Sequence, residues 1–258
     1  MRIAHLSDLH FGTAQDQIVV DVLDALRALS PHLIVISGDF TQTGSPTEYK
    51  LAAAFIAALP ASAFCVPGNH DISRYNLWGR LTNPYDLYKR YIAPGLEPFS
   101  VIDGILIAGV NTARRVLPHW NWANGAISAH QRKELATRLS QMRDALRIVV
   151  MHHPLHKAED SPLDVTVFGA GPAMDLLREQ AVDIVLTGHV HHASVTVQDD
   201  TVFISASTAI SGRVRQQKNG FNIIDIDDNS FTVTHYIHDG SAFGPNGTSH
   251  HERRRAAL

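Results

Sequence analysis

Five predicted strands end in side chains of the kind that bind metal ions, and this pattern limits what the chain can fold into more than any other feature. The eight side chains are Asp8 and His10, Asp39, Asn69 and His70, His152, and His189 and His191. In an open α/β sheet, functional sites form at the carboxyl ends of the strands. We therefore expect these residues, which span positions 8–191, to meet in one crevice.

Strands and helices alternate in the first part of the chain. An apolar stripe predicts a helix over residues 15–30, and a capping box with proline, Ser45-Pro46-Thr47-Glu48, predicts a second helix that ends near Leu59. Apolar and β-branched runs predict strands at 2–7, 33–36 and 64–66. The order β-α-β-α-β implies a parallel sheet with right-handed crossovers.

The chain continues to residue 240 without a linker, so we predict a single domain over residues 1–240. Further strands are expected at 100–102, 105–110, 147–151, 183–187, 194–198, 201–206, 221–226 and 231–237, and further helices from Ser128 and over 172–180. Residues 71–99 are less regular and contain many aromatic side chains, which we interpret as packing residues. Residues 241–258 are rich in Gly, Ser, His and Arg and are predicted to be a mobile tail.

The chemistry of the eight side chains favours transition metals. Imidazole nitrogens mixed with carboxylate and amide oxygens, without thiolate, suit Zn, Mn, Fe or Co better than Ca or Mg. Eight donors exceed the three or four protein ligands of one catalytic ion. Two divalent ions that share a bridging carboxylate would use such a set of donors naturally, and such a pair suits in-line displacement at phosphorus.

Composition excludes several classes of protein. With 22 Lys and Arg against 25 Asp and Glu, the formal net charge is −3, which argues against a nucleic-acid polymer or an anionic membrane as partner. The one cysteine, Cys65, cannot form an intrachain disulfide. No apolar run reaches the roughly 18 residues of a membrane span, and no secretory signal fits ahead of Asp8. We expect a cytoplasmic protein.

The same residues form blocks that resemble those of the calcineurin-like metallophosphoesterases, in the order of that family. The blocks are Asp8-Leu9-His10, Gly38-Asp39, Gly68-Asn69-His70-Asp71, His152 before His153-Pro154, and Gly188-His189-Val190-His191. Three further segments are similar to the bacterial branch of cyclic nucleotide and glycerophosphodiester phosphodiesterases. These are Gly38-Asp39-Phe40-Thr41, Gly44-Ser45-Pro46-Thr47-Glu48-Tyr49 and Asn111-Thr112.

The resemblance implies a fold and a ligand set. The fold would be a four-layer α/β/β/α sandwich of two mixed β-sheets flanked by helices. His70 would be a catalytic residue beside the scissile phosphate, and Asn69, His70 and His191 would contact the substrate. One metal ion would be held by Asp8, His10, Asp39 and His191, and the other by Asp39, Asn69, His152 and His189, with Asp39 as the bridge.

The resulting hypothesis is hydrolysis of phosphodiester bonds in small substrates, cyclic nucleotides or glycerophosphodiesters, by a metal-bridging hydroxide. Two divalent ions (+4), Asp8 and Asp39 (−2) and a hydroxide (−1) leave a formal charge of +1, which suits a diester monoanion better than a monoester dianion. The alternatives are a phosphomonoesterase or nucleotide pyrophosphohydrolase on the same site, and a non-catalytic scaffold, which would be expected to lose ligands. The sequence does not determine the oligomeric state, and a homo-oligomer is one of the states that it allows.

Several residues keep two interpretations. His70 could make a supporting hydrogen bond instead of acting in catalysis. Trp120 or Trp122 could wall a substrate pocket or pack, and Arg114 and Arg115 could hold a phosphate oxygen or be solvated. Three other histidines are expected in buried or hydrogen-bonding roles rather than as metal ligands. These are His5, His153 and His192.

Overall fold

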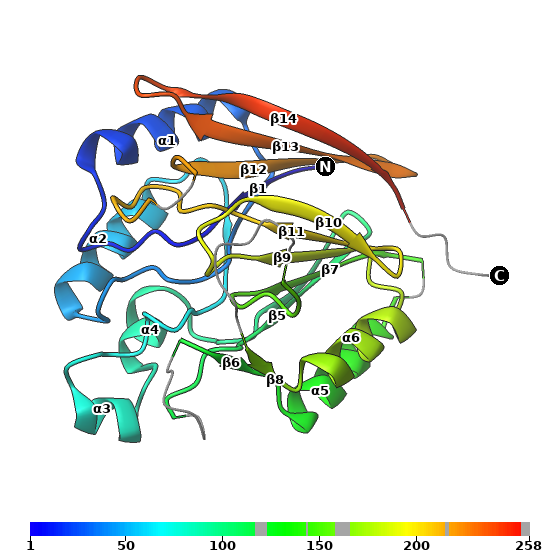
Figure 1. The fold of residues 1–258 in the computed structure, drawn as a ribbon, viewed down its shortest axis with the longest axis horizontal. Coiled ribbons are helices and arrows are strands. Elements are labelled where there is room, and N and C mark those ends of the chain that lie inside the picture. The colour runs from blue at the N-terminus through cyan, green and yellow to red at the C-terminus, as the bar shows by residue number, and fades with distance from the viewer. Residues whose placement is uncertain (117–122, 143, 158–165, 215–216, 254–258) are drawn as a thin grey trace.

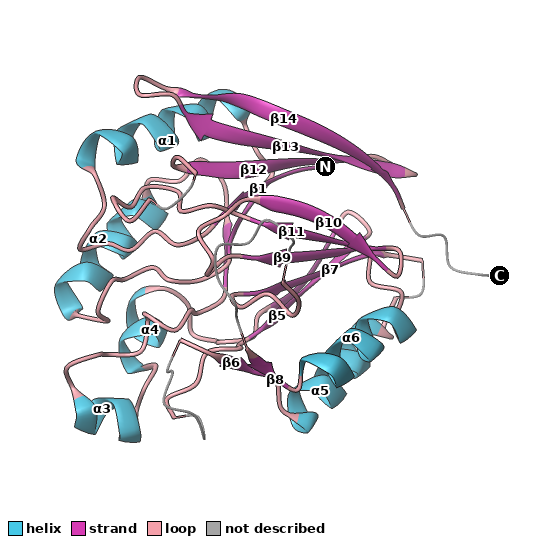
Figure 2. Cartoon of the chain, viewed as in Figure 1, coloured by secondary structure: helices cyan, strands magenta, loops and turns pink. Residues whose placement is uncertain are grey.

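Two six-stranded β-sheets pack face to face in the computed structural model, and helices cover the outer face of each (Figure 1; Figure 2). The structure describes residues 1–116, 123–142, 144–157, 166–214 and 217–253. The predicted four-layer α/β/β/α sandwich of two mixed sheets is confirmed.

The first sheet, here sheet I, combines three parallel strands with an antiparallel meander. In spatial order it contains β14 (Phe243–Glu252), β13 (Ser230–His238), β12 (Gly220–Ile226), β1 (Arg2–Leu6), β2 (Leu33–Ile36) and β3 (Ala63–Cys65). Strands β1, β2 and β3 are parallel, and β12 joins β1 in the antiparallel sense. The N-terminal β-α-β-α-β prediction therefore holds for this half of the sheet.

The second sheet, sheet II, has four parallel strands between two antiparallel edge strands. In spatial order it contains β10 (Ser194–Gln198), β11 (Thr201–Ser205), β9 (Ile184–Thr187), β7 (Leu146–Met151), β5 (Ile105–Val110) and β4 (Phe99–Ile102). Strands β11, β9, β7 and β5 run parallel. A separate parallel pair is formed by β6 (Gly125–Ala126) and β8 (Val167–Phe168).

Three apolar layers hold the sandwich together. Helices α1 (Asp16–Leu29) and α2 (Pro46–Ala57) pack on the outer face of sheet I, and α5 (Ala129–Leu139) and α6 (Ala170–Glu179) pack on the outer face of sheet II. The third layer lies between the sheets. Neighbouring residues of one strand pack in different apolar layers, because successive side chains point to opposite faces of the sheet. On β1, Ile3 lies between the sheets and Ala4 faces the helices.

Residues 71–99, which we predict to be irregular, contain two short helices, α3 (Leu77–Thr82) and α4 (Asp86–Tyr91). The packing interpretation holds for Tyr88, which is fully buried and meets Phe40 edge to face. It is wrong for Tyr75 and Trp78, which are 76% and 78% exposed.

The predicted mobile tail over residues 241–258 is wrong for most of its length, because residues 243–252 form β14. This strand pairs antiparallel with β13 and closes the edge of sheet I. Side-chain contacts between the two strands include the polar pair of Thr234 and Thr248 and a stacked contact between Phe231 and His251. A strand held by backbone pairing at an exposed edge has little of the apolar alternation that sequence patterns detect.

No helix in the described part of the chain is long and apolar enough to cross a membrane.

The capping box predicted at the start of α2 is present and also holds the loop that precedes the helix. The Ser45 hydroxyl accepts a hydrogen bond from the Glu48 backbone N–H at 3.3 Å. The Glu48 carboxylate accepts from the backbone N–H and hydroxyl of Thr43, both at 2.9 Å, and from the backbone N–H of Ser45 at 3.2 Å. One carboxylate, 9% exposed, therefore fixes residues 43–45.

We expect Glu48→Ala to lower the free energy of unfolding by about 2 kcal/mol, because it leaves donors in a poorly solvated loop without an acceptor. Urea unfolding of the metal-free protein measures this change. Glu134→Ala, at an exposed position of α5, has the same change in helix propensity and should alter the unfolding free energy little. Equal losses in the two variants would show that the loop contacts contribute nothing.

Candidate metal centre

The loops after β1, β2, β3, β7 and β9 bring all eight predicted side chains to one edge of the sandwich. Direct contacts join the two sheets there. The backbone N–H of His189, after β9, donates to Asp8 Oδ2, after β1, at 2.9 Å. A Cβ on Gly188 would lie 1.8 Å from Ser7 Oγ, and one on Gly68 would lie 2.1 Å from Asp39 Oδ1. Glycine is required at both positions, because no other residue fits against the neighbouring ligand loop.

Five of the seven predicted metal ligands have a left-handed backbone conformation. Their φ angles are +53° at Asp8, +46° at His10, +55° at Asp39, +71° at His189 and +54° at His191. Residues other than glycine adopt this conformation rarely. Such strain persists where the surrounding structure holds it, and it is concentrated at functional sites.

A first cluster joins Asp8, His10 and His191. The Nε2 atoms of the two histidines are 3.0 Å apart, and Asp8 Oδ1 lies 3.1 Å from His191 Nε2 and 3.6 Å from His10 Nε2. Backbone carbonyls fix both rings from behind, because Nδ1–H of His10 donates to Thr41 O at 3.3 Å and Nδ1–H of His191 donates to Arg213 O at 3.0 Å. In the neutral rings the proton is therefore on Nδ1, and the Nε2 lone pairs face each other.

A second cluster joins Asn69, His152 and His189 beside Asp39. The Asn69 Oδ1 atom lies 3.2 Å from His152 Nε2 and 3.0 Å from His189 Nδ1, and these two nitrogens are 3.3 Å apart. His152 is also oriented from behind, since its Nδ1–H donates to Ser37 O at 2.8 Å. Its Nε2 is thereby directed at the other members of the cluster.

Asp39 lies between the two clusters. Its Oδ2 atom is 3.3 Å from His152 Nε2 and 3.7 Å from His10 Nε2. Its Oδ1 atom accepts the backbone N–H of His70 at 2.8 Å. The Asp39 carboxylate therefore lies within 4 Å of a ring nitrogen from each cluster.

The electrostatics of the site favour a cation. Asp8 Oδ1 is fully buried and has no hydrogen-bond partner. Burial raises the pKa of Asp8, but His191 and His10 outweigh burial and keep the pKa well below its usual range. Burial lowers the pKa of His152, but Asp39 outweighs it and raises the pKa to about 9. Converging lone pairs and ionised carboxylates therefore fit divalent cations of the kind that the mixed nitrogen and oxygen donors suit.

His70 lies at the edge of this centre. Its Nδ1–H donates to Gln42 O at 2.7 Å, and its ring meets that of His10 edge to face with centroids 4.8 Å apart. A ring nitrogen of His70 lies within 4.8 Å of ligand atoms of His10 and Asp39. The hydrogen bond to Gln42 leaves Nε2 as the atom available to a substrate.

Three neighbouring histidines have other partners. His153 lies within 4.8 Å of the possible ligand atoms of His152 and His189, but its nitrogens contact Thr112 Oγ1 at 2.7 Å and Ala123 O at 3.0 Å. Burial holds its pKa well below the usual range. His5 contacts Ser37 and His192 contacts Gln217. These contacts agree with the hydrogen-bonding roles expected for the three residues.

The two arginines considered as phosphate ligands are directed elsewhere. Arg114 donates to the carbonyls of Asn111 and Ala113 at 2.6 and 2.8 Å, and Arg115 donates to Leu81 O at 2.6 Å. Trp120 and Trp122 lie outside the described residues.

Sequence reasoning missed Gln42 and Arg213, which both contact His70. Arg213 follows β11, and β11 is parallel to β9, so the carboxyl end of β11 reaches the edge that carries the predicted metal ligands. That topology is the signal that could have drawn attention to the Ser211-Gly212-Arg213 segment.

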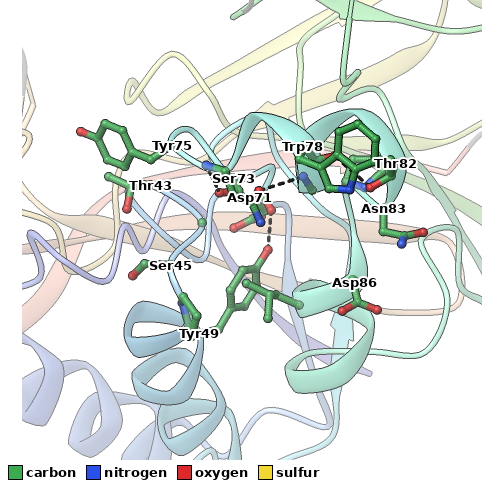
Figure 3. A pocket seen from close by; sticks show the side chains of 16 residues that line it. Thr43, Ser45, Tyr49, Asp71, Ser73, Tyr75, Trp78, Thr82, Asn83 and Asp86 are labelled. Carbon is green, nitrogen blue, oxygen red and sulfur yellow. Dashed lines mark hydrogen bonds between the residues drawn. The ribbon is translucent and has the colours of Figure 1, made fainter.

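A cavity of about 560 Å³ adjoins the loops that carry the site (Figure 3). Its lining includes Thr43 and Asp71, which follow Gln42 and His70 in the chain, and also Tyr75 and Trp78. Figure 3 shows the Tyr49 side chain below Asp71, with its hydroxyl donating to the Asp71 backbone carbonyl. Cavities of about 300–1,000 Å³ accommodate small organic molecules.

Comparison with known proteins relates this site to phosphoesterases. The chain is 25% identical over 225 residues to a probable glycerophosphodiester phosphodiesterase, GpdQ, of Arcobacter nitrofigilis, which covers 81% of this chain and 78% of that protein. It is 27% identical over 264 residues to a cAMP/cGMP dual specificity phosphodiesterase of Mycobacterium tuberculosis, with 91% and 78% covered. The fold is similar to that of a dimetal phosphatase from Danio rerio, with a TM-score of 0.71 at 13% identity, and 98% and 99% of the chains covered.

The model of the calcineurin-like phosphoesterase family matches residues 1–193, which include every predicted ligand of both clusters. Because the match spans about three quarters of its length, the chain belongs to the calcineurin-like phosphoesterase family.

Proposed function

We propose that this protein hydrolyses phosphodiester bonds in small substrates, with cyclic nucleotides and glycerophosphodiesters as the first classes to test. The observation that carries the proposal is the convergence of imidazole lone pairs with a buried Asp8 oxygen that has no hydrogen-bond partner. Away from water, converging lone pairs without hydrogen-bond donors are stabilised by bound cations or by protons. The names of the two phosphodiesterase relatives support the choice of substrate class.

The proposed ligand sets follow the two clusters. One divalent ion, with Mn, Fe, Zn and Co as candidates, is assigned to Asp8, His10, Asp39 and His191. The other is assigned to Asp39, Asn69, His152 and His189, and Asp39 is shared. When bound, the two ions would withdraw charge from the phosphoryl oxygens and provide a water-derived nucleophile at neutral pH.

The chain's own groups position the reaction. The carbonyls of Thr41, Ser37 and Arg213 hold three ligand histidines in one tautomer and one orientation, which is the usual role of groups behind a metal ligand. The Gln42 carbonyl does the same for His70. A proton on His70 Nε2 would pass to the departing alkoxide oxygen, and the Asn69 amide and His191 would contact the substrate from the ligand side.

The first test is an assay of the metal-free protein reloaded with Mn, Zn, Fe(II) or Co. We expect at least one loaded form to hydrolyse methyl 4-nitrophenyl phosphate and a cyclic nucleotide or glycerophosphodiester, and a chelator to abolish both activities. Hydrolysis of monoesters alone would favour the phosphomonoesterase alternative. If no loaded form cleaves any ester, the scaffold alternative gains support.

We expect Asp39→Ala to abolish activity and to lower the metal content from two equivalents to one or none, because Asp39 is the one residue assigned to both ions. Elemental analysis of the purified protein gives the metal content. Asp175→Ala on α6, where the side chain is 63% exposed, is the control and should keep both ions. Two tightly held ions in an active Asp39→Ala variant would refute the bridging assignment.

We expect the cost of His70→Ala to depend on the leaving group. General acid catalysis contributes about 10²–10⁴-fold, so hydrolysis of a diester with an alkoxide leaving group should slow by about that factor. A nitrophenolate departs without a proton, so a nitrophenyl diester should lose markedly less. His130→Ala, at an exposed position of α5, controls for the loss of an imidazole.

The metal content should stay near two equivalents in His70→Ala. Equal losses on the two diesters would mean that His70 positions the phosphoryl group, and loss of an ion would mean that His70 is itself a ligand.

A further inference from the structure

Arg213 contacts both the first cluster, at His191, and His70. Its backbone carbonyl accepts Nδ1–H of the ligand His191 at 3.0 Å. Its guanidinium Nη1 donates to Gln42 Oε1 at 3.2 Å and lies 3.5 Å from His70 Nε2. The side chain therefore lies next to the one atom of His70 that is available to a substrate.

The loop that carries Arg213 is anchored at several points, so this placement does not depend on the arginine itself. The Arg213 backbone N–H donates to Ser211 Oγ at 3.0 Å, and Gly212 N–H donates to Thr13 O at 2.8 Å. Asn219 donates to Ser211 O at 2.8 Å, and the hydroxyls of Thr13 and Ser211 are 2.9 Å apart. The guanidinium group is thus presented from a fixed backbone.

The charge of Arg213 is not balanced by a neighbouring carboxylate. Its side-chain contacts are to a neutral amide and an imidazole, and no carboxylate oxygen in the described part of the chain lies within 4.0 Å of its guanidinium nitrogens. Arg114 and Arg115, in contrast, donate to backbone carbonyls away from His70. A half-buried guanidinium presents a planar set of five N–H donors that matches two oxygens of a phosphate.

We propose that Arg213 binds a non-bridging phosphoryl oxygen of the substrate beside His70. It would thereby raise kcat/KM for dianionic substrates more than for monoanionic ones. The proposal rests on the proposed function, because it takes a phosphate ester as the ligand. Arg213 also changes the formal charge of the site. The sum of the two ions, Asp8, Asp39 and the hydroxide is +1 and does not include Arg213. With Arg213 the formal charge becomes +2, which suits a phosphomonoester dianion as well as a diester.

The test compares Arg213→Gln and Arg213→Lys with the wild-type protein on two substrates that share a nitrophenolate leaving group, 4-nitrophenyl phosphate and methyl 4-nitrophenyl phosphate. We expect Arg213→Gln to lower kcat/KM for the dianionic monoester about 10- to 100-fold and for the diester several-fold less. Arg213→Lys should recover part of the loss. Arg115→Gln removes the same charge from an exposed position and should leave both substrates unaffected.

Two measurements that do not depend on turnover accompany the kinetics. Calorimetric titration of the metal-loaded protein with inorganic phosphate should show at least tenfold weaker binding in Arg213→Gln, and elemental analysis should show two ions in every variant. Equal loss on the two esters with unchanged phosphate affinity would overturn the proposal. Loss of an ion from both variants would overturn it as well, because Arg213 would then act through His191.

The same titration separates this proposal from the proposed function. If the wild-type protein binds phosphate but cleaves neither ester, the proposed function fails. The role of Arg213 is then decided by phosphate affinity alone, since a tenfold loss in Arg213→Gln supports it and an unchanged affinity refutes it.

Discussion

The structure depends on a set of buried carboxylates and imidazoles whose lone pairs point at one another. Asp8 and Asp39 are 0% and 1% exposed, and they meet three histidine nitrogens within 3.7 Å. Burying such charge without compensation is unfavourable. The metal-free chain compensates partly with protons, because Asp39 raises the pKa of His152 against the effect of burial. A divalent cation does the same more completely, so metal binding and the stability of this end of the sandwich are expected to be coupled.

The two sheets make this arrangement possible by ending their parallel strands at the same edge. Sheet I contributes the predicted ligands that follow β1, β2 and β3, and sheet II those that follow β7 and β9. The apolar layer between the sheets fixes their relative position, and the absence of a side chain at Gly68 and Gly188 lets the ligand loops approach each other. The strained backbone of Asp8, Asp39 and His189 is tolerated because the core on both sides holds these loops in place.

Much of this could be predicted from the sequence, because it is encoded in short apolar runs and local caps. Strands β2 and β5 and helices α1 and α2 begin and end within about two residues of their predicted bounds. β14 could not be predicted, since a polar strand at an open edge is specified by its partner β13 rather than by its own pattern. Arg213 and Gln42 were missed for a similar reason. Each is a single polar residue in a loop, and only the three-dimensional arrangement places it against His70.

His152 and His153 show what sequence proximity leaves undecided. The two residues are adjacent and fully buried, with rings 4.9 Å apart. His152 uses one nitrogen on the Ser37 carbonyl and directs the other at Asp39 and Asn69. His153 uses both nitrogens on Thr112 and Ala123. A buried histidine is therefore able to bind a metal only when the protein leaves one of its ring nitrogens free. Thr112, in the loop after β5, and Ala123 occupy both nitrogens of His153, so His152 and not His153 keeps this capacity.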